Sequence, residues 1–133
     1  MNLLTLDPTQ DPGQDLRCPY LEGHPSPDGP PAFDRRLDEA GRCWLVFDQP
    51  DSRVNLWSEA TLREFVWHLE QISHDTRVRS LIIRSGKPGS FIAGADLKQL
   101  SALQGARLKQ LIWLGQAAFE RLARIAVPKV AVI

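Results

Sequence analysis

The alternation of apolar and polar positions predicts two strands near the middle of the chain. Residues 43–47, Cys-Trp-Leu-Val-Phe, are a short apolar run rich in strand-forming side chains. Residues 33–37 form a weaker run of the same kind. Between them lies the polar segment 38–41, which ends in Gly41 and predicts a turn. Together the two runs predict a β-hairpin.

A helical spacing of apolar side chains follows the hairpin. The positions concerned are Leu62, Phe65, Val66, Leu69 and Ile72. Intervals of three and four residues predict an amphipathic helix with one buried face. Ser58 stands before this stripe as an N-cap, and Glu59 falls in the first turn, where a carboxylate suits the helix dipole. His68 lies off the stripe without partners at metal-ligand spacing, so a surface histidine is expected, as at His74.

Another strand, a second helical stripe and a last strand complete the pattern. Residues 81–83 are uniformly apolar, which suits a buried strand of a mostly parallel sheet. The second stripe consists of Leu108, Leu111, Ile112, Gly115, Ala118, Phe119, Leu122 and Ile125. Pro128 ends this helix because proline lacks an amide donor, and residues 130–133 start a further strand of buried type. The order β-β-α-β-α-β predicts an α/β fold with right-handed crossovers.

Proline and glycine set the first part of the chain apart. Residues 1–32 contain seven of the ten prolines and three glycines, with few aromatic or β-branched side chains. Such a segment buries too little apolar surface to offset its ordering entropy. We therefore predict a disordered leader over residues 1–32 and a folded domain over residues 33–133. A proline-rich docking peptide is the alternative, although no PxxP flanked by basic residues is present.

Charge and cysteine content exclude several classes of protein. Sixteen basic and sixteen acidic side chains cancel, so nothing favours a nucleic-acid partner. Cys18 and Cys43 lack metal-ligand spacing, and a disulfide framework is not expected, which predicts a reducing compartment and no metal site. No signal peptide and no membrane-length apolar run is predicted. These observations predict a cytoplasmic protein without a membrane partner.

The stretch 86–100, GKPGSFIAGADLKQL, concentrates small residues between a predicted strand and a helix. Glycines permit backbone conformations that other residues avoid, and Ala93, Gly94 and Ala95 leave little bulk above the main chain. If the helix begins at Ala95 or Asp96, amide groups there are unpaired and suited to an oxyanion. The alternative is that the small residues only allow tight packing and Asp96 only caps the helix. Neither G-x-G-x-x-G nor a P-loop is present.

Several segments resemble the crotonase superfamily of enoyl-CoA hydratases, isomerases and their relatives. FIAGADLK at 91–98 follows an apolar strand and Ser-Gly-Lys, as in that family. Asp-Gln-Pro at 48–50 followed by Val-Asn at 54–55 resembles the family's first strand-to-helix loop. IAVPKVAVI at 125–133 resembles its helix end and next strand. The similarity covers residues 33–133 and is greatest to the hydratase part of bacterial multifunctional fatty-acid-oxidation alpha subunits.

The resemblance implies roles for the small residues. It implies that the chain is the N-terminal half of a crotonase-type ββα spiral, incomplete at its C-terminal side. Ala95 matches the position whose backbone N–H is one of two oxyanion donors to the thioester. Ala93 and Leu97 match positions that line the bent CoA, Gly94 allows close approach, and Asp96 helps to start the helix. Ala93, Gly94, Asp96 and Leu97 are thus the expected substrate-binding residues, with Ala95 catalytic.

The second oxyanion donor and the hydratase glutamates of the family belong to segments beyond residue 133. Four glutamates follow residue 50, each on a predicted helix away from the motif, and none is carried over as an acid or base: Glu59, Glu64, Glu70 and Glu120. The chain is therefore expected to be a fragment or truncated gene model without activity of its own.

The first hypothesis for function is an enoyl-CoA hydratase/isomerase of fatty-acid β-oxidation, which is a lyase. In a multifunctional protein, this domain would be the first part of a chain with both hydratase and 3-hydroxyacyl-CoA dehydrogenase activity. The alternatives are a non-catalytic acyl-CoA-binding or interaction module and an inactive truncated relic. The expected partner is an acyl-CoA thioester. No separate cofactor is expected, and NAD is expected only if a dehydrogenase domain follows. Full-length family members are usually oligomeric, whereas acyl-chain length, reaction type and the assembly of this chain stay open.

Overall fold

The computed structural model describes residues 29–133. The predicted disordered leader, residues 1–32, therefore lies outside the described residues except for 29–32. Ala32 within that short remainder is buried, at 5% exposure. The packed part of the chain thus includes one residue before the predicted domain start at Phe33.

Seven helices and strands make up the described residues. They are β1 (Phe33–Leu37), β2 (Arg42–Phe47), α1 (Glu59–His74), β3 (Ser80–Ser85), α2 (Leu97–Ala102), α3 (Ala106–Arg124) and β4 (Lys129–Val132). The predicted order of elements is confirmed, except that two helices replace the one expected between β3 and β4. Gly105 separates them, because its φ of 57° lies outside the helical region.

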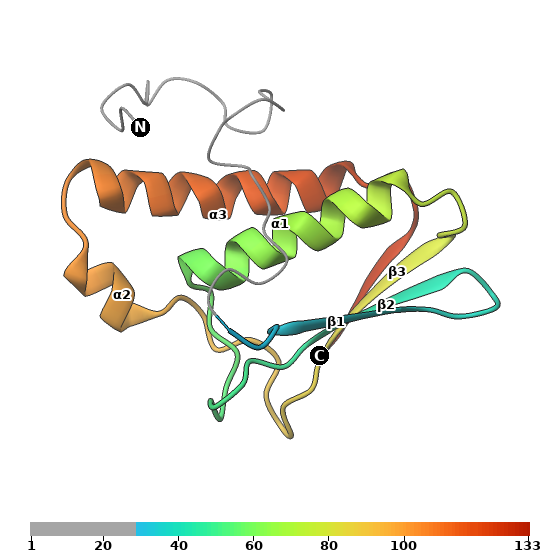
Figure 1. Cartoon of the computed structure of the whole chain (residues 1–133), viewed down its shortest axis with the longest axis horizontal. Helices are drawn as coiled ribbons and strands as arrows, with labels where there is room; N and C mark the ends of the chain where they lie inside the picture. Colours follow the sequence, from blue (N-terminus) through green and yellow to red (C-terminus); the bar gives the residue numbers. More distant parts are fainter. Residues whose placement is uncertain (1–28) are drawn as a thin grey trace.

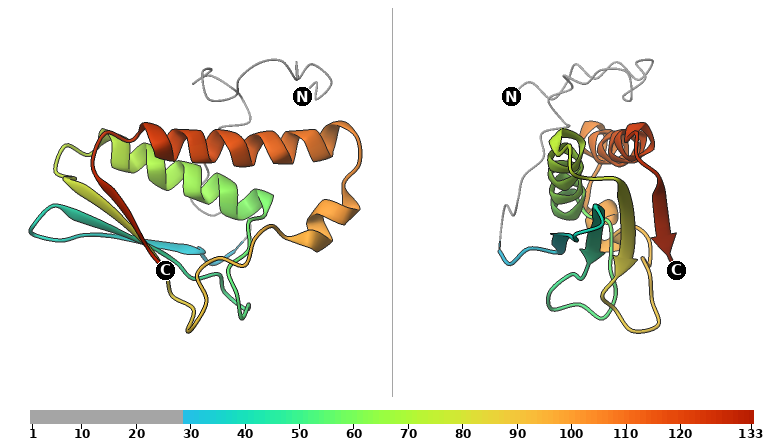
Figure 2. Two further views of the ribbon diagram at one scale, coloured as in Figure 1. Left: turned by 180° about the vertical axis from the view of Figure 1, so that it is seen from behind. Right: turned by 90° about the vertical axis from the view of Figure 1, so that its right-hand side faces the viewer.

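The four strands form one sheet in the order β1-β2-β3-β4. β1 and β2 form the predicted antiparallel hairpin. β2 pairs with β3 in parallel, as β3 does with β4, so the prediction of a mostly parallel sheet is also confirmed. Helices α1 and α3 lie side by side on one face of the sheet (Figure 1, Figure 2). The architecture is thus a sheet covered on one side by a helix pair.

The core lies between the sheet and the two long helices. Alternate residues of β2 face the helices, and Leu45 and Phe47 are fully buried there. All five apolar positions of the predicted α1 stripe are buried as well. Burying such side chains stabilises the fold by about 1.5–3 kcal/mol each.

The start of α1 is fixed by a capping box. Ser58 Oγ accepts a hydrogen bond from Thr61 N at 3.2 Å, and Ser58 N donates to Thr61 Oγ1 at 2.8 Å. These two bonds satisfy backbone groups that a helix terminus otherwise leaves unpaired. The predicted N-cap is therefore confirmed, with threonine in the place that glutamate often takes.

His68 is buried, at 6% exposure, so the prediction of a surface histidine is wrong there. β1 covers this side of α1, which a helical stripe alone does not reveal. Arg35 of β1 places a guanidinium nitrogen 3.2 Å from His68 Nδ1, and His68 Nε2 lies 3.8 Å from the buried Glu64 carboxylate. His74 is exposed near the helix end, as predicted.

The predicted α3 stripe is buried only in part. Ile112 and Phe119 are 47% and 44% exposed, whereas Leu114 and Ala117, which the stripe did not include, are buried. The reason is that α3 packs against α1 with one flank and leaves the other flank open. β4 is exposed along its whole length, although its apolar sequence predicted a buried strand.

No helix within residues 29–133 combines the length and hydrophobicity needed to cross a membrane. In the same part of the chain, no three histidine, cysteine, aspartate or glutamate side chains come together as a metal site does.

Candidate functional site

The small-residue segment lies beside the loop that leads into α1. Both leave the sheet at the same end, where β2 and β3 terminate (Figure 1). Three backbone hydrogen bonds join them at 2.8 Å each: Ala93 N to Asn55 O, Trp57 N to Gly94 O, and Asp96 N to Trp57 O. Trp57 and Ala95 thereby form a parallel bridge. Two loops without regular structure are thus held as a short piece of sheet.

This pairing directs the Ala95 amide away from its neighbour. In a parallel bridge, one residue exchanges hydrogen bonds with the residues on either side of its opposite number. Trp57 does so with Gly94 and Asp96, so the Ala95 N–H points to the other side. Among the described residues no backbone acceptor faces it, and Ala95 is exposed. A free donor, flanked on both sides by hydrogen-bonded residues, therefore stands at the predicted oxyanion position.

The helix that follows begins later than the alternatives considered from sequence. Asp96 is the N-cap and α2 starts at Leu97, so the Ala95 amide is free because of the bridge and not because of a helix terminus. Asp96 Oδ1 accepts hydrogen bonds from Lys98 N at 3.1 Å and Gln99 N at 3.2 Å. The expectation that Asp96 helps to start the helix is confirmed.

The other predicted binding residues surround Ala95 on the surface. Ala93 and Gly94 are exposed, and Leu97 is 75% exposed. Gly94 has a φ of 109°, which side-chain-bearing residues rarely adopt, and a Cβ there would meet nothing within 4 Å. The glycine is needed for the backbone path and also leaves open space above it.

An apolar groove of about 200 Å³ runs beside Ala95 between α1, α2 and α3. Its walls are built by Trp57, Leu62, Leu100, Leu111, Ile112, Gly115 and Phe119, together with Ala95. The Trp57 and Phe119 rings meet edge to face, with centroids 5.4 Å apart. The exposed flank of α3 is thus one wall of the groove. Trp57 was not among the site residues predicted from the sequence, although it directly precedes the predicted N-cap Ser58.

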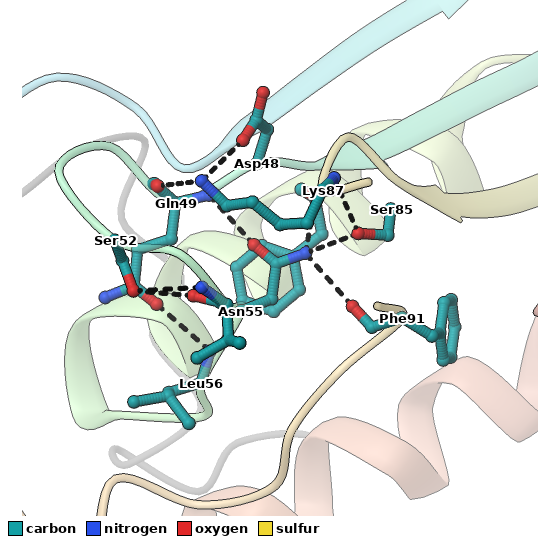
Figure 3. A network of polar contacts seen from close by, with 10 residues as sticks. Asp48, Gln49, Ser52, Asn55, Leu56, Ser85, Lys87 and Phe91 are labelled. Carbon is teal, nitrogen blue, oxygen red and sulfur yellow. Dashed lines mark hydrogen bonds and ion pairs between the residues drawn. The ribbon is translucent and has the colours of Figure 1, made fainter. Parts of the chain in front are cut away.

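A buried polar network supports the segment from below (Figure 3). Asn55 is fully buried, and its Nδ2 lies 2.7 Å from Phe47 O, 3.0 Å from Ser85 Oγ and 3.1 Å from Phe91 O. Asn55 Oδ1 accepts from Gln49 N at 2.9 Å. One side chain therefore joins the ends of β2 and β3 to the segment that carries Ala95.

Lys87 joins the same network through contacts with the loop after β2. Its Nζ lies 2.5 Å from Gln49 O and 2.7 Å from Asp48 Oδ1, and the side chain is only 11% exposed. Gly86 passes so close to Asp48 that a Cβ would come within 2.7 Å of it. The glycine therefore serves close approach of two loops, and the lysine is occupied by this contact.

The four glutamates lie on helices, as predicted, and Glu59 at the start of α1 is near α2, since its N–H donates to Gln99 Oε1 at 2.8 Å. Each carboxylate has a partner: Glu59 pairs with Arg63, Glu70 with Arg121, Glu120 with Arg124, and Glu64 accepts from the backbone of Ala32 and Phe33. Sequence analysis did not anticipate the buried role of Glu64.

Two groups with displaced pKa values also lie away from the segment. Burial raises the pKa of the Cys43 thiol, which favours the unreactive protonated form. Hydrogen bonds from Arg77 lower the pKa of Asp75 to about 2. Cys43 is at the start of β2 and Asp75 follows the end of α1, so neither is placed to act on a ligand at Ala95.

Comparison with known proteins finds relatives both in sequence and in structure. The chain is 36% identical over 104 residues to the fatty acid oxidation complex subunit alpha of Vibrio cholerae, covering 77% of this chain. It is 34% identical over 103 residues to the same subunit of Vibrio parahaemolyticus. A solved enoyl-CoA hydratase of Mycobacterium smegmatis superposes on 77% of the chain with a TM-score of 0.70 and 24% identity. No protein-family model matches.

These similarities extend over part of each relative. The chain spans 15% of the length of either Vibrio subunit and 39% of the Mycobacterium hydratase chain. The sequence comparison confirms the resemblance to fatty-acid-oxidation alpha subunits, and the structural comparison confirms that the described residues form part of a crotonase-type fold.

Proposed function

We propose that residues 33–133 form the acyl-CoA-binding part of an enoyl-CoA hydratase/isomerase that acts in fatty-acid oxidation. One observation carries the proposal: Ala95, whose N–H is free and flanked by two backbone hydrogen bonds, lines an apolar groove. A thioester needs both features, since its carbonyl is polar and its acyl chain is apolar. The relatives named fatty acid oxidation complex subunit alpha support the same conclusion.

The Ala95 N–H donates to the thioester oxygen, where negative charge collects when an enolate forms. A backbone donor fixed before binding stabilises that charge without reorganisation, and one such donor is worth roughly 3 kcal/mol in the transition state. The acyl chain lies in the groove between Trp57 and α3, while Ala93 and Leu97 border the CoA. The substrate supplies the CoA, so the step assigned to Ala95 needs no separate cofactor.

Isothermal titration calorimetry of residues 1–133 with butanoyl-CoA and with free CoA tests this function. Saturable binding in which the thioester binds more tightly than CoA is the expected result. Equal affinity for both ligands, or no binding of either, would contradict the proposal.

A non-catalytic acyl-CoA-binding module is the second candidate, because every glutamate after residue 50 is engaged elsewhere in the structure. We expect residues 1–133 by themselves to bind an enoyl-CoA without hydrating it, since they comprise only part of the fold. The loss of enoyl-thioester absorbance measures turnover. Hydration above the uncatalysed rate that is abolished by a substitution in the described residues would contradict this expectation.

A charge placed in the groove is expected to weaken binding of an acyl-CoA more than binding of free CoA. Ile112 lines the groove and is 47% exposed, so Ile112→Asp is not expected to disturb folding. It is expected to weaken hexanoyl-CoA binding about tenfold, because burying an unpaired carboxylate against apolar surface is unfavourable. Binding of free CoA is expected to change less than about twofold.

Gln116→Asp is the matched control, because it adds the same charge to an exposed position of α3 outside the groove. Calorimetry with both ligands compares the two variants. Equal weakening by both substitutions would show that the groove does not hold the acyl chain.

A further inference from the structure

We propose that Asn55 is a positioning residue that fixes the Ala95 N–H in the direction of the thioester oxygen. The inference rests on the function proposed above and deepens it. Asn55 does not line the groove and is fully buried beneath the surface that carries Ala95. Its effect on a ligand therefore passes through the backbone that it holds.

Both the side chain and the main chain of Asn55 bind the segment that carries Ala95. Asn55 Nδ2 lies 3.1 Å from Phe91 O, and Asn55 O accepts a hydrogen bond from Ala93 N at 2.8 Å. Trp57, two residues further on, forms the bridge to Ala95. The segment from Phe91 to Ala95 is thus attached at three successive points to residues 55–57.

Only the start of that segment is held by side-chain packing, because Phe91 and Ile92 are partly buried against the core. Gly89, which precedes the segment, and Gly94 within it adopt φ values of 67° and 109°, where glycine is favoured, and no atom lies within 4 Å of the Cβ position at either. Ala93 and Ala95 are exposed. From Ala93 onward side-chain packing therefore contributes little to the conformation, and the contacts with Asn55 and Trp57 direct the Ala95 amide.

An amide suits this position and a carboxylate does not. Three oxygen atoms, of Phe47, Ser85 and Phe91, surround Nδ2, while the Gln49 N–H faces Oδ1. Only asparagine presents a donor and an acceptor in this shape and size. Asn55→Asp keeps the shape but turns an oxygen toward three oxygens, so the contact with Phe91 is expected to be lost.

The test compares Asn55→Asp with wild type in ¹⁵N-labelled residues 1–133. Acetoacetyl-CoA is a suitable probe, because its enolate shares negative charge between the ketone and thioester oxygens. We expect Asn55→Asp to lose most of the ligand-induced shift of the Ala95 amide resonance. Affinity for the probe is expected to fall about tenfold, against less than about threefold for free CoA.

Two controls separate positioning from general loss of stability. Ile72→Val removes one methyl group from the core at the far end of α1 and is expected to leave the Ala95 shift unchanged. Ser85→Ala removes one neighbour of Asn55 and keeps the contact with Phe91, so we expect at least half of the shift to remain. If Asn55→Asp does not fold, Asn55→Ser is measured in its place, with the same loss expected.

A folded Asn55 variant with an unchanged Ala95 shift and unchanged probe affinity would overturn the inference. An Ile72→Val variant that loses the shift as fully as Asn55→Asp would overturn it as well. Failure of the proposed function is distinguishable, because the wild-type chain itself would then bind no acyl-CoA or would bind it no more tightly than free CoA. Positioning by Asn55 requires a wild-type shift at Ala95 together with its selective loss on substitution at position 55.

Discussion

Ala95→Pro is expected to weaken binding of acetoacetyl-CoA to residues 1–133 by at least tenfold. Proline has no amide hydrogen, so the substitution removes the one donor assigned to the thioester oxygen. A hydrogen bond to a charged acceptor contributes about 1.5–3 kcal/mol, which corresponds to roughly ten- to hundredfold in affinity. In an active hydratase containing this segment, we expect kcat to fall on the order of a hundredfold.

The structure makes Ala95→Pro a specific substitution. The Ala95 N–H has no backbone acceptor among residues 29–133, so its loss breaks no described hydrogen bond, and the flanking bonds of Gly94 and Asp96 with Trp57 are expected to persist. Ala95→Gly keeps the N–H and is expected to change affinity less than about threefold. Circular dichroism confirms folding of both variants. A folded proline variant with unaltered affinity would show that Ala95 is not the donor.

Glu64→Ala is expected to lower the free energy of unfolding by about 3 kcal/mol. The Glu64 side chain is buried, at 4% exposure, and accepts hydrogen bonds from Ala32 N at 3.0 Å and Phe33 N at 2.9 Å. Alanine leaves both amides without their partner in a place that water does not reach. The carboxylate therefore joins the start of β1 to α1, and chemical denaturation measures the loss.

Glu120→Ala is the control for the loss of a charged side chain. Glu120 pairs with Arg124 on the exposed side of α3, where both side chains are more than 40% exposed. Exposed pairs contribute about 0–1 kcal/mol, so little change is expected. If the two alanine variants unfold at the same denaturant concentration, then Glu64 does not anchor β1.

The hairpin, α1 and β3 were predictable because their signals are local. Residues 43–47 alternate between the core and the other face of the sheet, and every apolar position of the α1 stripe is buried. The small residues of 86–100 were predicted to lie between a strand and a helix, and Ala95 lies there, between β3 and α2. Short-range sequence patterns were sufficient to predict a helix or strand wherever one face of that element packs on one neighbouring element.

The missed features depend on contacts between distant residues. His68 and Glu64 are buried by β1, which lies about thirty positions earlier in the chain. Asn55 gains its role from Phe91, 36 positions later. The exposed flank of α3 borders a groove whose other walls come from the α1 region and α2. Hydrophobic periodicity indicates that one face of a helix or strand is apolar. It does not indicate which element, or which ligand, covers that face.

Amide chemical shifts of ¹⁵N-labelled residues 1–133, titrated with acetoacetyl-CoA, test the central claim most directly. Ala93 N and Asp96 N are already bonded to Asn55 O and Trp57 O, whereas Ala95 N is free. The account predicts a saturable downfield shift of the Ala95 amide proton that exceeds those of its two neighbours and is absent with free CoA. Saturable binding of the thioester that leaves the Ala95 amide unshifted would contradict it.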